Sequence, residues 1–170
     1  MIWIPTFEQH SRAYLPGVTR EDVWAGLGWR DAYRDLWPGR SKPRAKGGEY
    51  RFDSRGDAEA YADEVLGLFA NMGDPIEVFR AVRSEESPTL DEPGESWSFR
   101  REAAIAFGGH NGSNWLMSAK VRRRGVDWKK TVGAYVQFSG GYDGDDECEI
   151  VVRDSHALED IRVVPLKAKR

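Results

Sequence analysis

Cysteine is nearly absent from this sequence, and its scarcity excludes two common kinds of small protein. The 170 residues contain one cysteine, Cys148, so we expect neither a disulfide framework nor a metal centre of the cysteine type. A long apolar run is also missing, because no segment approaches the ~20 residues that a membrane-spanning helix needs. The first residues, 1–5, lack the charged region and apolar stretch of a signal peptide. We therefore expect a cytoplasmic protein without a membrane partner.

An excess of charge of one sign is missing too. The chain has 25 Lys and Arg against 28 Asp and Glu, and its net charge of -3 gives no general argument for a nucleic-acid or membrane partner. Its 40% hydrophobic and 31% charged residues are typical of an ordinary globular protein. At this length one domain can bury its own core, and we expect a monomer. Seven tryptophans indicate a large aromatic core or stacking surfaces.

Hydrophobic periodicity predicts helices in the first half of the chain and mainly strands in the second. Thr19, with Asp22 three residues later, has the form of a helix N-cap. Residues 57–70 carry apolar side chains at helical spacing, and Asp57 is placed to cap this helix. Strands are predicted at 76–83, 115–121, 150–152 and 161–166, and 132–138 fits either a strand or a short helix. This order of elements indicates an α+β fold in one domain.

A short helix is predicted at 100–107. Ala103, Ala104 and Phe107 have the spacing that would turn them inward, toward the core. The two glycines that follow, Gly108 and Gly109, are expected to end this helix.

Two carboxylates stand at the start of a predicted strand, after a glycine-rich acidic loop. Glu147 and Glu149 are two residues apart, so a strand would present both on one face. Carboxylates held so close repel each other, so such a pair is more typical of an active site than of an ordinary surface. Earlier in the chain, Arg80 shares a strand face with the apolar Val78 and Val82. An arginine there either reaches to an edge or holds an anion.

Three pieces thus follow one another in a particular order: Val78-Phe79-Arg80 in a strand, Ser96-Trp97-Ser98 before a helix, and Glu147-Cys148-Glu149 entering a strand. In this order and spacing, residues 55–167 resemble a mono-ADP-ribosyltransferase of the Arg–Ser–Glu type, the class that includes toxin and bacteriophage enzymes. If such an enzyme acts inside a host, the host-cell cytoplasm is its expected location.

The resemblance implies a particular architecture. We expect N-terminal helices followed by a split, mostly antiparallel two-sheet β core around an NAD cleft. Residues 1–54 would form a helical and loop extension packed on the core, and residues 55–170 the ADP-ribosyltransferase-like catalytic core.

The resemblance also assigns the residues that would bind NAD as co-substrate. Arg80 would hold the phosphates, since a guanidinium is a planar and permanently charged clamp. Ser96 and Ser98 match the serine motif of the class and would fix the pocket by hydrogen bonds. Tyr142, in the glycine-flanked loop, would touch the acceptor or stack on the nicotinamide.

The two glutamates carry the proposed catalysis. Breaking the nicotinamide–ribose bond builds oxocarbenium character at the sugar carbon, as in glycoside hydrolysis. Glu149 would bind the ribose hydroxyl and stabilise that positive charge. Glu147 would orient or deprotonate the incoming nucleophile. Two glutamates at these positions imply, by analogy, an arginine of a protein as the acceptor.

Other functions fit the same residues. The site could act on a nucleic-acid base, a small molecule or water, and the basic stretches 40–46 and 120–130 leave room for nucleic acid. A non-catalytic binding module with this fold is a third possibility.

Each residue also has a plain structural explanation. Arg80 could form an ordinary salt bridge, and Arg83 competes with it as the phosphate clamp. Ser96 and Ser98 could cap the helix that follows them, and the two glutamates could be edge charges that discourage aggregation.

Overall fold

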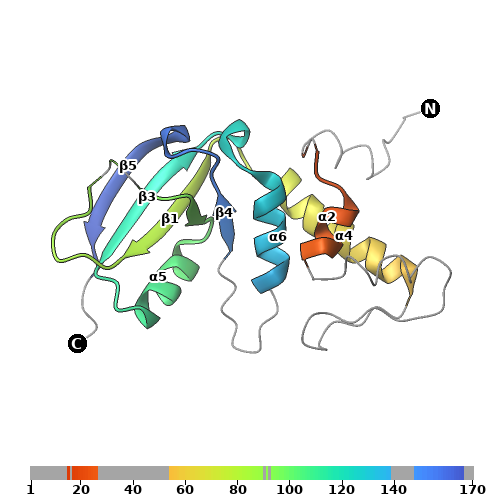
Figure 1. The fold of residues 1–170 in the computed structure, drawn as a ribbon, viewed down its shortest axis with the longest axis horizontal. Coiled ribbons are helices and arrows are strands. Elements are labelled where there is room, and N and C mark those ends of the chain that lie inside the picture. Colours follow the sequence, from red (N-terminus) through yellow and green to blue (C-terminus); the bar gives the residue numbers. More distant parts are fainter. Residues whose placement is uncertain are drawn as a thin grey trace. The chain divides into compact units, whose positions relative to one another are not determined.

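The structure, a computed structural model, describes residues 15, 17–26, 54–89, 91, 93–138 and 148–166. These residues form helices and one antiparallel sheet, which confirms the predicted α+β class (Figure 1). The chain divides into two compact units, Met1–Met72 with Val132–Gln137, and Gly73–Thr131 with Phe138–Arg170. The predicted extension 1–54 falls largely outside the described residues and stays a prediction.

The first unit contains helices that begin at side-chain caps. α2 (Arg20–Gly26) follows Thr19, whose backbone N–H donates to the Asp22 carboxylate at 3.0 Å, in agreement with the predicted capping pattern. α4 (Arg55–Ala70) contains the predicted helix 57–70. Its cap is Ser54, whose hydroxyl accepts from the backbone N–H of Asp57 at 3.1 Å. Ser54 is therefore the N-cap, and Asp57, whose backbone N–H it accepts from, lies in the first turn of the helix.

Aromatic side chains hold the helices of the first unit together. The indole N–H of Trp24 on α2 donates to the carbonyl oxygen of Ala58 on α4 at 3.0 Å. Phe69 of α4 meets Tyr135 edge to face, with ring centroids 5.3 Å apart. Tyr135 belongs to α6 (Trp128–Phe138), so the ambiguous segment 132–138 is helical.

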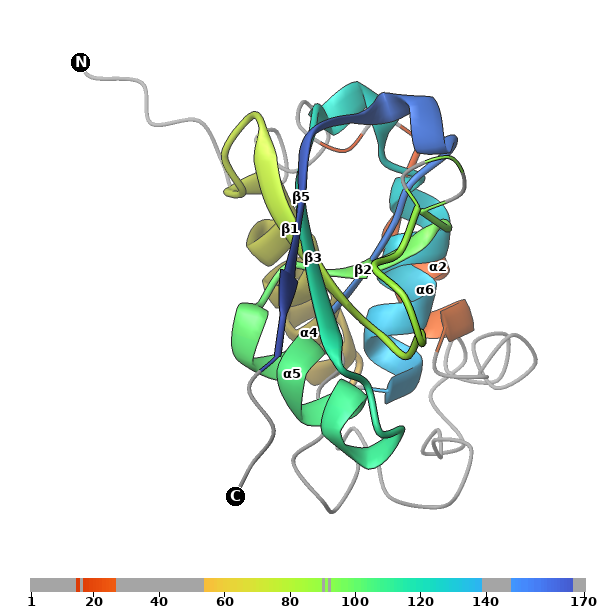
Figure 2. The same ribbon diagram turned by 90° about the vertical axis from the view of Figure 1, so that its left-hand side faces the viewer.

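The second unit is organised around a five-stranded antiparallel sheet in the order β4-β2-β1-β3-β5 (Figures 1 and 2). Its strands are β1 (Ile76–Val82), β2 (Ser96–Ser98), β3 (Trp115–Val121), β4 (Glu149–Val151) and β5 (Leu158–Pro165). Two short 3-10 turns lie between these elements: η1 (Arg123–Gly125) between β3 and α6, and η2 (Ser155–Ala157) between β4 and β5. All four strands predicted from the sequence are present; β3 has the predicted bounds, and the other three have shifted ends.

The expectation of two sheets is wrong for the described residues, which form one. β1 and β3 pair along their whole length, whereas β1 and β2 meet at the single pair Phe79↔Ser98. Figure 2 shows β2 running across the direction of β1, β3 and β5. This one pair joins β2 and β4 to the rest of the sheet. As a result β1, β2 and β4 are neighbours in the sheet.

α5 (Arg101–His110) packs against β1 and β2. It includes Gly108 and Gly109, so the prediction that these glycines end the helix is wrong. Gly108 is buried, and a Cβ there would overlap the Cβ of Ala81 on β1. The glycine therefore allows the helix to approach the strand closely. In the ranges that the structure describes, none of the helices has both the length and the apolar character needed to cross a membrane.

Candidate functional site

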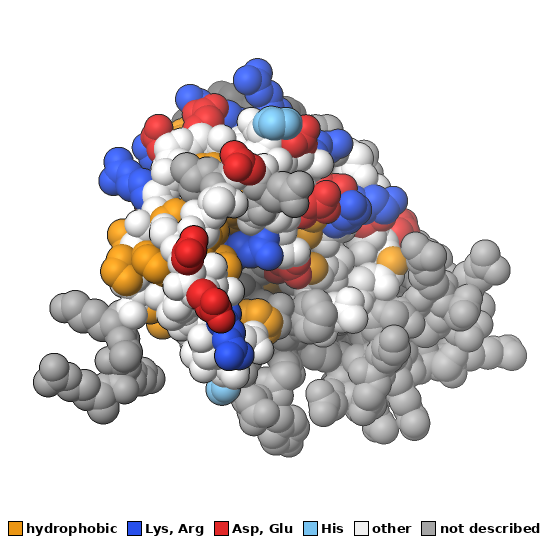
Figure 3. All heavy atoms as spheres, turned by 60° about the vertical axis from the view of Figure 1, so that its left-hand side comes forward, with side chains coloured by type: hydrophobic (Ala, Val, Ile, Leu, Met, Phe, Trp, Pro, Cys, Tyr) orange, Lys and Arg blue, Asp and Glu red, His pale blue; other side chains and the backbone are white. Residues whose placement is uncertain are grey.

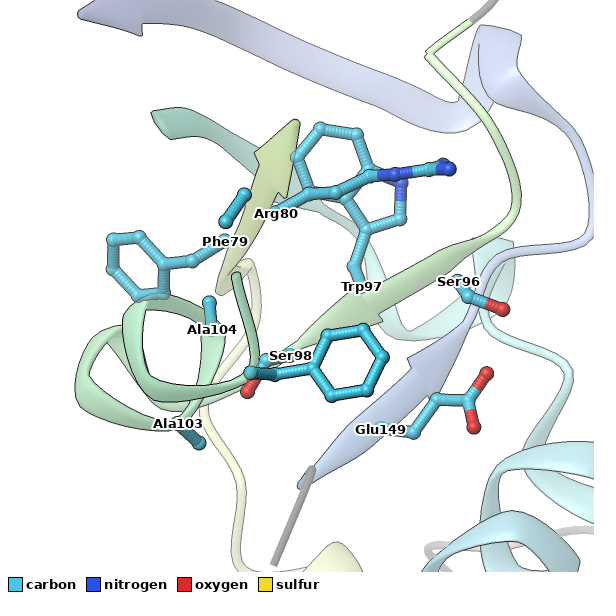
Figure 4. Close-up of a pocket in the computed structure, with 10 residues that line it drawn as sticks. Phe79, Arg80, Ser96, Trp97, Ser98, Ala103, Ala104 and Glu149 are labelled. Carbon is cyan, nitrogen blue, oxygen red and sulfur yellow. The ribbon is translucent and has the colours of Figure 1, made fainter. Parts of the chain in front are cut away.

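A cavity of about 410 Å³ lies between the sheet of the second unit and α5, a volume in the usual range of small-molecule sites (Figure 4). The residues that line it are Phe79, Arg80, Ala81, Ser96, Trp97, Ser98, Ala103, Ala104, Phe107 and Glu149. Four of the predicted site residues belong to this set, namely Arg80, Ser96, Ser98 and Glu149. The other two, Glu147 and Tyr142, lie outside the described residues. Arg83, the competing arginine, is exposed and does not line the cavity.

The register of the sheet explains how distant segments meet here. Phe79 is paired with Ser98, and Ser98 with Glu149, so the three form one row across β1, β2 and β4. Residues directly opposite in antiparallel strands present their side chains to the same face. Ser96, two residues before Ser98, shares that face.

Arg80 is a half-buried cation with one hydrogen-bond acceptor. Its Nη1 donates to the carbonyl oxygen of Pro93 at 2.6 Å, and Arg80 forms no ion pair with the described residues. A guanidinium carries five N–H donors, so most of them remain for a ligand. Burial lowers the pKa of Arg80 below its ordinary value, although arginine stays cationic at neutral pH. The ordinary salt bridge considered above is therefore absent from the described part of the chain.

Glu149 is a partly exposed carboxylate at the first position of β4. Like Arg80, it has no ion pair with the described residues, and its carboxylate also has no hydrogen bond with them. In Figure 4 the Arg80 guanidinium, the Ser96 hydroxyl and the Glu149 carboxylate extend toward the same side of the cavity. The two opposite charges therefore face one cavity without neutralising each other.

The backbone around Glu149 is fixed on both sides of β4. One edge pairs with β2, and on the other the Asp127 N–H donates to the Val151 carbonyl at 2.8 Å. The Val151 N–H donates to the hydroxyl of Thr131, a fully buried side chain, at 2.9 Å. Cys148, buried just before the strand, has a φ of 50°, in the left-handed region that is uncommon for residues other than glycine. Such strained positions cluster at functional sites.

The two serines differ in what their hydroxyls do. Ser98 is buried, and its Oγ accepts from the Arg100 N–H at 3.1 Å and donates to the Arg100 carbonyl at 2.9 Å. It closes the turn into α5 and does not cap that helix, whose N-cap Arg100 has no side-chain cap bond. Ser96 is exposed at the cavity wall, and its hydroxyl makes no hydrogen bond with the described residues. Ser96 is therefore the serine placed to bind a ligand.

Phe107 of α5 lines the cavity, although the sequence predicts it in the core. Phe107 was expected to pack inward with Ala103 and Ala104, but it is 49% exposed and lines the cavity, so that prediction is wrong. The buried residues of α5 are instead Ala104, which is 5% exposed, and Gly108. Helical spacing marks one side of a helix, but cannot tell a face that covers a core from one that borders a cavity.

Within the described ranges, no group of three or more His, Cys, Asp or Glu side chains is arranged to hold a metal ion. No protein-family model, curated protein or solved structure matches the chain.

Proposed function

We propose that this protein is a mono-ADP-ribosyltransferase that cleaves NAD at the nicotinamide–ribose bond and transfers ADP-ribose to an arginine of a protein. One observation carries the proposal. Arg80 and Glu149, which are far apart in the sequence, line one cavity, and neither is paired with an opposite charge of the described protein.

A ligand that carries both an anionic group and a hydroxyl group would bind to both charged residues of such a cavity. A half-buried charge without a partner loses hydration and gains little in return. Phosphate oxygens would accept the remaining Arg80 donors in charge-assisted hydrogen bonds. A sugar hydroxyl would donate to Glu149, which would also stabilise the positive charge that develops on the sugar. NAD carries both groups.

The reaction breaks the C–N bond between ribose and nicotinamide, and the bonding electrons leave with the nicotinamide nitrogen. The acceptor nitrogen then forms a new bond to the same sugar carbon and gives up one proton. In this scheme Glu149 stabilises the oxocarbenium-like transition state, and Ser96 positions the ligand or the carboxylate. Glu147 would take the acceptor's proton, and Tyr142 would contact the acceptor or the nicotinamide.

Charge pairing favours a protein acceptor over a nucleic acid. In the basic stretch 120–130, Lys120 lies 2.9 Å from Asp160 and Arg122 lies 3.7 Å from Glu159. Over the face in Figure 3, acidic and basic side chains are interspersed without a broad area of one sign. A nucleic-acid site needs a clustered basic surface. An arginine acceptor instead needs carboxylates, which align its guanidinium.

The proposal is tested by measuring nicotinamide release from NAD, with and without a cell lysate as the source of acceptor. Glu149→Gln should lower release at least about 100-fold, because it removes the stabilising charge and keeps the shape. Glu77→Gln is the matched control, since Glu77 is an exposed glutamate of β1 outside the cavity. Equal release by wild type and Glu149→Gln would contradict the proposal.

A second variant separates cleavage from transfer. Glu147→Gln should still release nicotinamide but should no longer label the lysate, which mass spectrometry of modified peptides would show. Labelling of arginine by wild type, and its loss in Glu147→Gln, would support the acceptor; labelling of nucleic acid only would contradict it.

A further inference from the structure

The segment before β2 carries the only described acceptor of the Arg80 guanidinium. The Pro93 carbonyl accepts from Arg80 Nη1 at 2.6 Å. The next carbonyl, that of Gly94, accepts from the indole N–H of Trp97 at 3.0 Å, and Trp97 is 2% exposed. Two successive carbonyls thus join this turn to two side chains of the cavity.

Gly94 has no side chain at the point where the guanidinium lies. An added Cβ would overlap Arg80 Nη1 and come within 2.6 Å of Arg80 Cζ. The backbone of Gly94 also has a φ of 81°, which glycine adopts without strain. The guanidinium therefore lies directly against the backbone of the turn.

From these contacts we infer that Gly94 is a positioning residue, which holds the Arg80 guanidinium in the orientation that binds a diphosphate group. Any larger residue at 94 would displace that group. The displacement should occur in Arg80 itself, since the guanidinium is the far end of a flexible side chain and can swing away at little cost. Sequence alone gives no hint of this role, because Pro93-Gly94 is an ordinary turn signal.

A matched glycine separates this effect from backbone strain. Gly112 also has a positive φ, of 67°, but a Cβ there would meet nothing within 4 Å. Alanine is strained at both positions, so Gly94→Ala and Gly112→Ala should lose similar stability. Only Gly94→Ala should change the orientation of the Arg80 guanidinium.

The first readout is the Arg80 Nε–H signal in a nitrogen-15 NMR spectrum of the ligand-free protein, assigned by its loss in Arg80→Ala. Gly94→Ala should move this signal toward the position of a solvent-exposed arginine, and Gly112→Ala should leave it unchanged. An unchanged signal in Gly94→Ala would overturn the inference. Because no ligand is needed, this readout does not depend on the proposed function.

The second readout is the affinity for inorganic pyrophosphate, measured by isothermal titration calorimetry. Arg80→Ala and Gly94→Ala should each weaken binding about 10-fold or more, and the double variant should bind no more weakly than Arg80→Ala alone. Additive losses, or equal binding by Gly94→Ala and Gly112→Ala, would overturn the inference. So would a wild type whose pyrophosphate affinity does not depend on Arg80.

A second variant is available if Gly94→Ala does not fold. Trp97→Phe keeps an aromatic side chain but removes the indole N–H that donates to the Gly94 carbonyl, and it should weaken pyrophosphate binding about 2- to 5-fold. Unchanged binding together with an unchanged Arg80 signal would overturn the inference.

The inference uses the proposed function only for the identity of the natural ligand. If pyrophosphate binds through Arg80 and Gly94 while nicotinamide release is absent, the proposed function fails and the inference stands. If nicotinamide is released at equal rates by Gly94→Ala and Gly112→Ala, the inference fails and the proposed function stands.

Discussion

Arg20 and Arg80 are both partly buried arginines, but within the described residues only Arg20 has a carboxylate partner. Arg20 of α2 donates through Nε and Nη2 to the two carboxylate oxygens of Asp63 on α4, at 2.7 and 2.8 Å. This is the bidentate geometry in which a guanidinium is best satisfied. Arg80 donates to a single carbonyl and has no carboxylate partner in the described part of the chain. The first arginine stabilises its unit, and under the proposed function the second binds the ligand.

The largest effect on activity outside Glu149 is expected for Arg80→Ala. It should lower kcat/KM for nicotinamide release about 100-fold, because two charge-assisted hydrogen bonds to the ligand are lost. The free energy of unfolding, measured in urea, should not fall, since a half-buried charge that has no opposite charge beside it in the described part of the chain is removed. Arg83→Ala, which changes an exposed arginine outside the cavity, should behave like wild type. A loss of activity in Arg83→Ala but not in Arg80→Ala would show that Arg83, and not Arg80, binds the ligand.

Arg20→Ala should have the opposite result. It breaks a bidentate pair whose side chains are 26% and 24% exposed, and should lower the free energy of unfolding by about 1–2 kcal/mol. Nicotinamide release by the folded variant should stay at the wild-type level. Arg55→Ala is the control, because Arg55 is 63% exposed and its ion pair with Glu59 should contribute only a few tenths of a kcal/mol. Equal unfolding energies for the two variants would contradict the contrast.

Phe107→Ala tests the apolar wall of the same cavity. An exposed aromatic ring can stack on a base or on the nicotinamide, which is worth about 0.5–1.5 kcal/mol, so KM for NAD should rise about 2- to 10-fold with little change in kcat. Leu68→Ala is the control, since Leu68 is a similarly exposed apolar residue of α4. An unchanged KM in Phe107→Ala would remove Phe107 from the ligand site.

The smallest effect is expected at an ion pair whose two residues do not line the cavity. The hydrogen bond and charge of Lys120 lower the pKa of Asp160 below its ordinary value of 3.8. A pKa that is lowered in the folded state contributes stability that is fully present above pH 3.8 and is lost as the pH falls through the pKa of the folded state. Asp160→Asn should therefore be slightly less stable than wild type at pH 7, and the difference should disappear in acid. Asparagine tolerates the φ of 53° at this position, so a difference that persists in acid would contradict the electrostatic cause.

Elements with a clear periodicity could be predicted from the sequence, whereas packing details could not. The helix 57–70 and the strand at 76–83 are present because their local patterns agree with their tertiary surroundings. The single sheet could not be predicted, because the joining pair Phe79↔Ser98 is one contact between strands that local sequence does not specify. The exposure of Phe107 was missed for a similar reason, since it depends on how α5 lies on the sheet.

For the candidate site, the sequence predicts polar residues that line the cavity, but not the contacts that hold them in place. Arg80, Ser96 and Glu149 were chosen by residue type and order, and the structure brings them to one cavity. The different states of the two serine hydroxyls depend on the turn after β2, which only the structure shows. The role of Gly94 depends on a contact with a residue that lies in another strand.

The most direct test of the central claim is NAD binding to a protein that cannot cleave it. The account predicts that Glu149→Gln binds NAD in calorimetric titration, with a Kd close to the KM of the wild type. Adding Arg80→Ala to Glu149→Gln should weaken that binding about 100-fold, and adding Arg83→Ala should not change it. If Glu149→Gln fails to bind NAD, or binds it equally well with and without Arg80, then this cavity is not an NAD site.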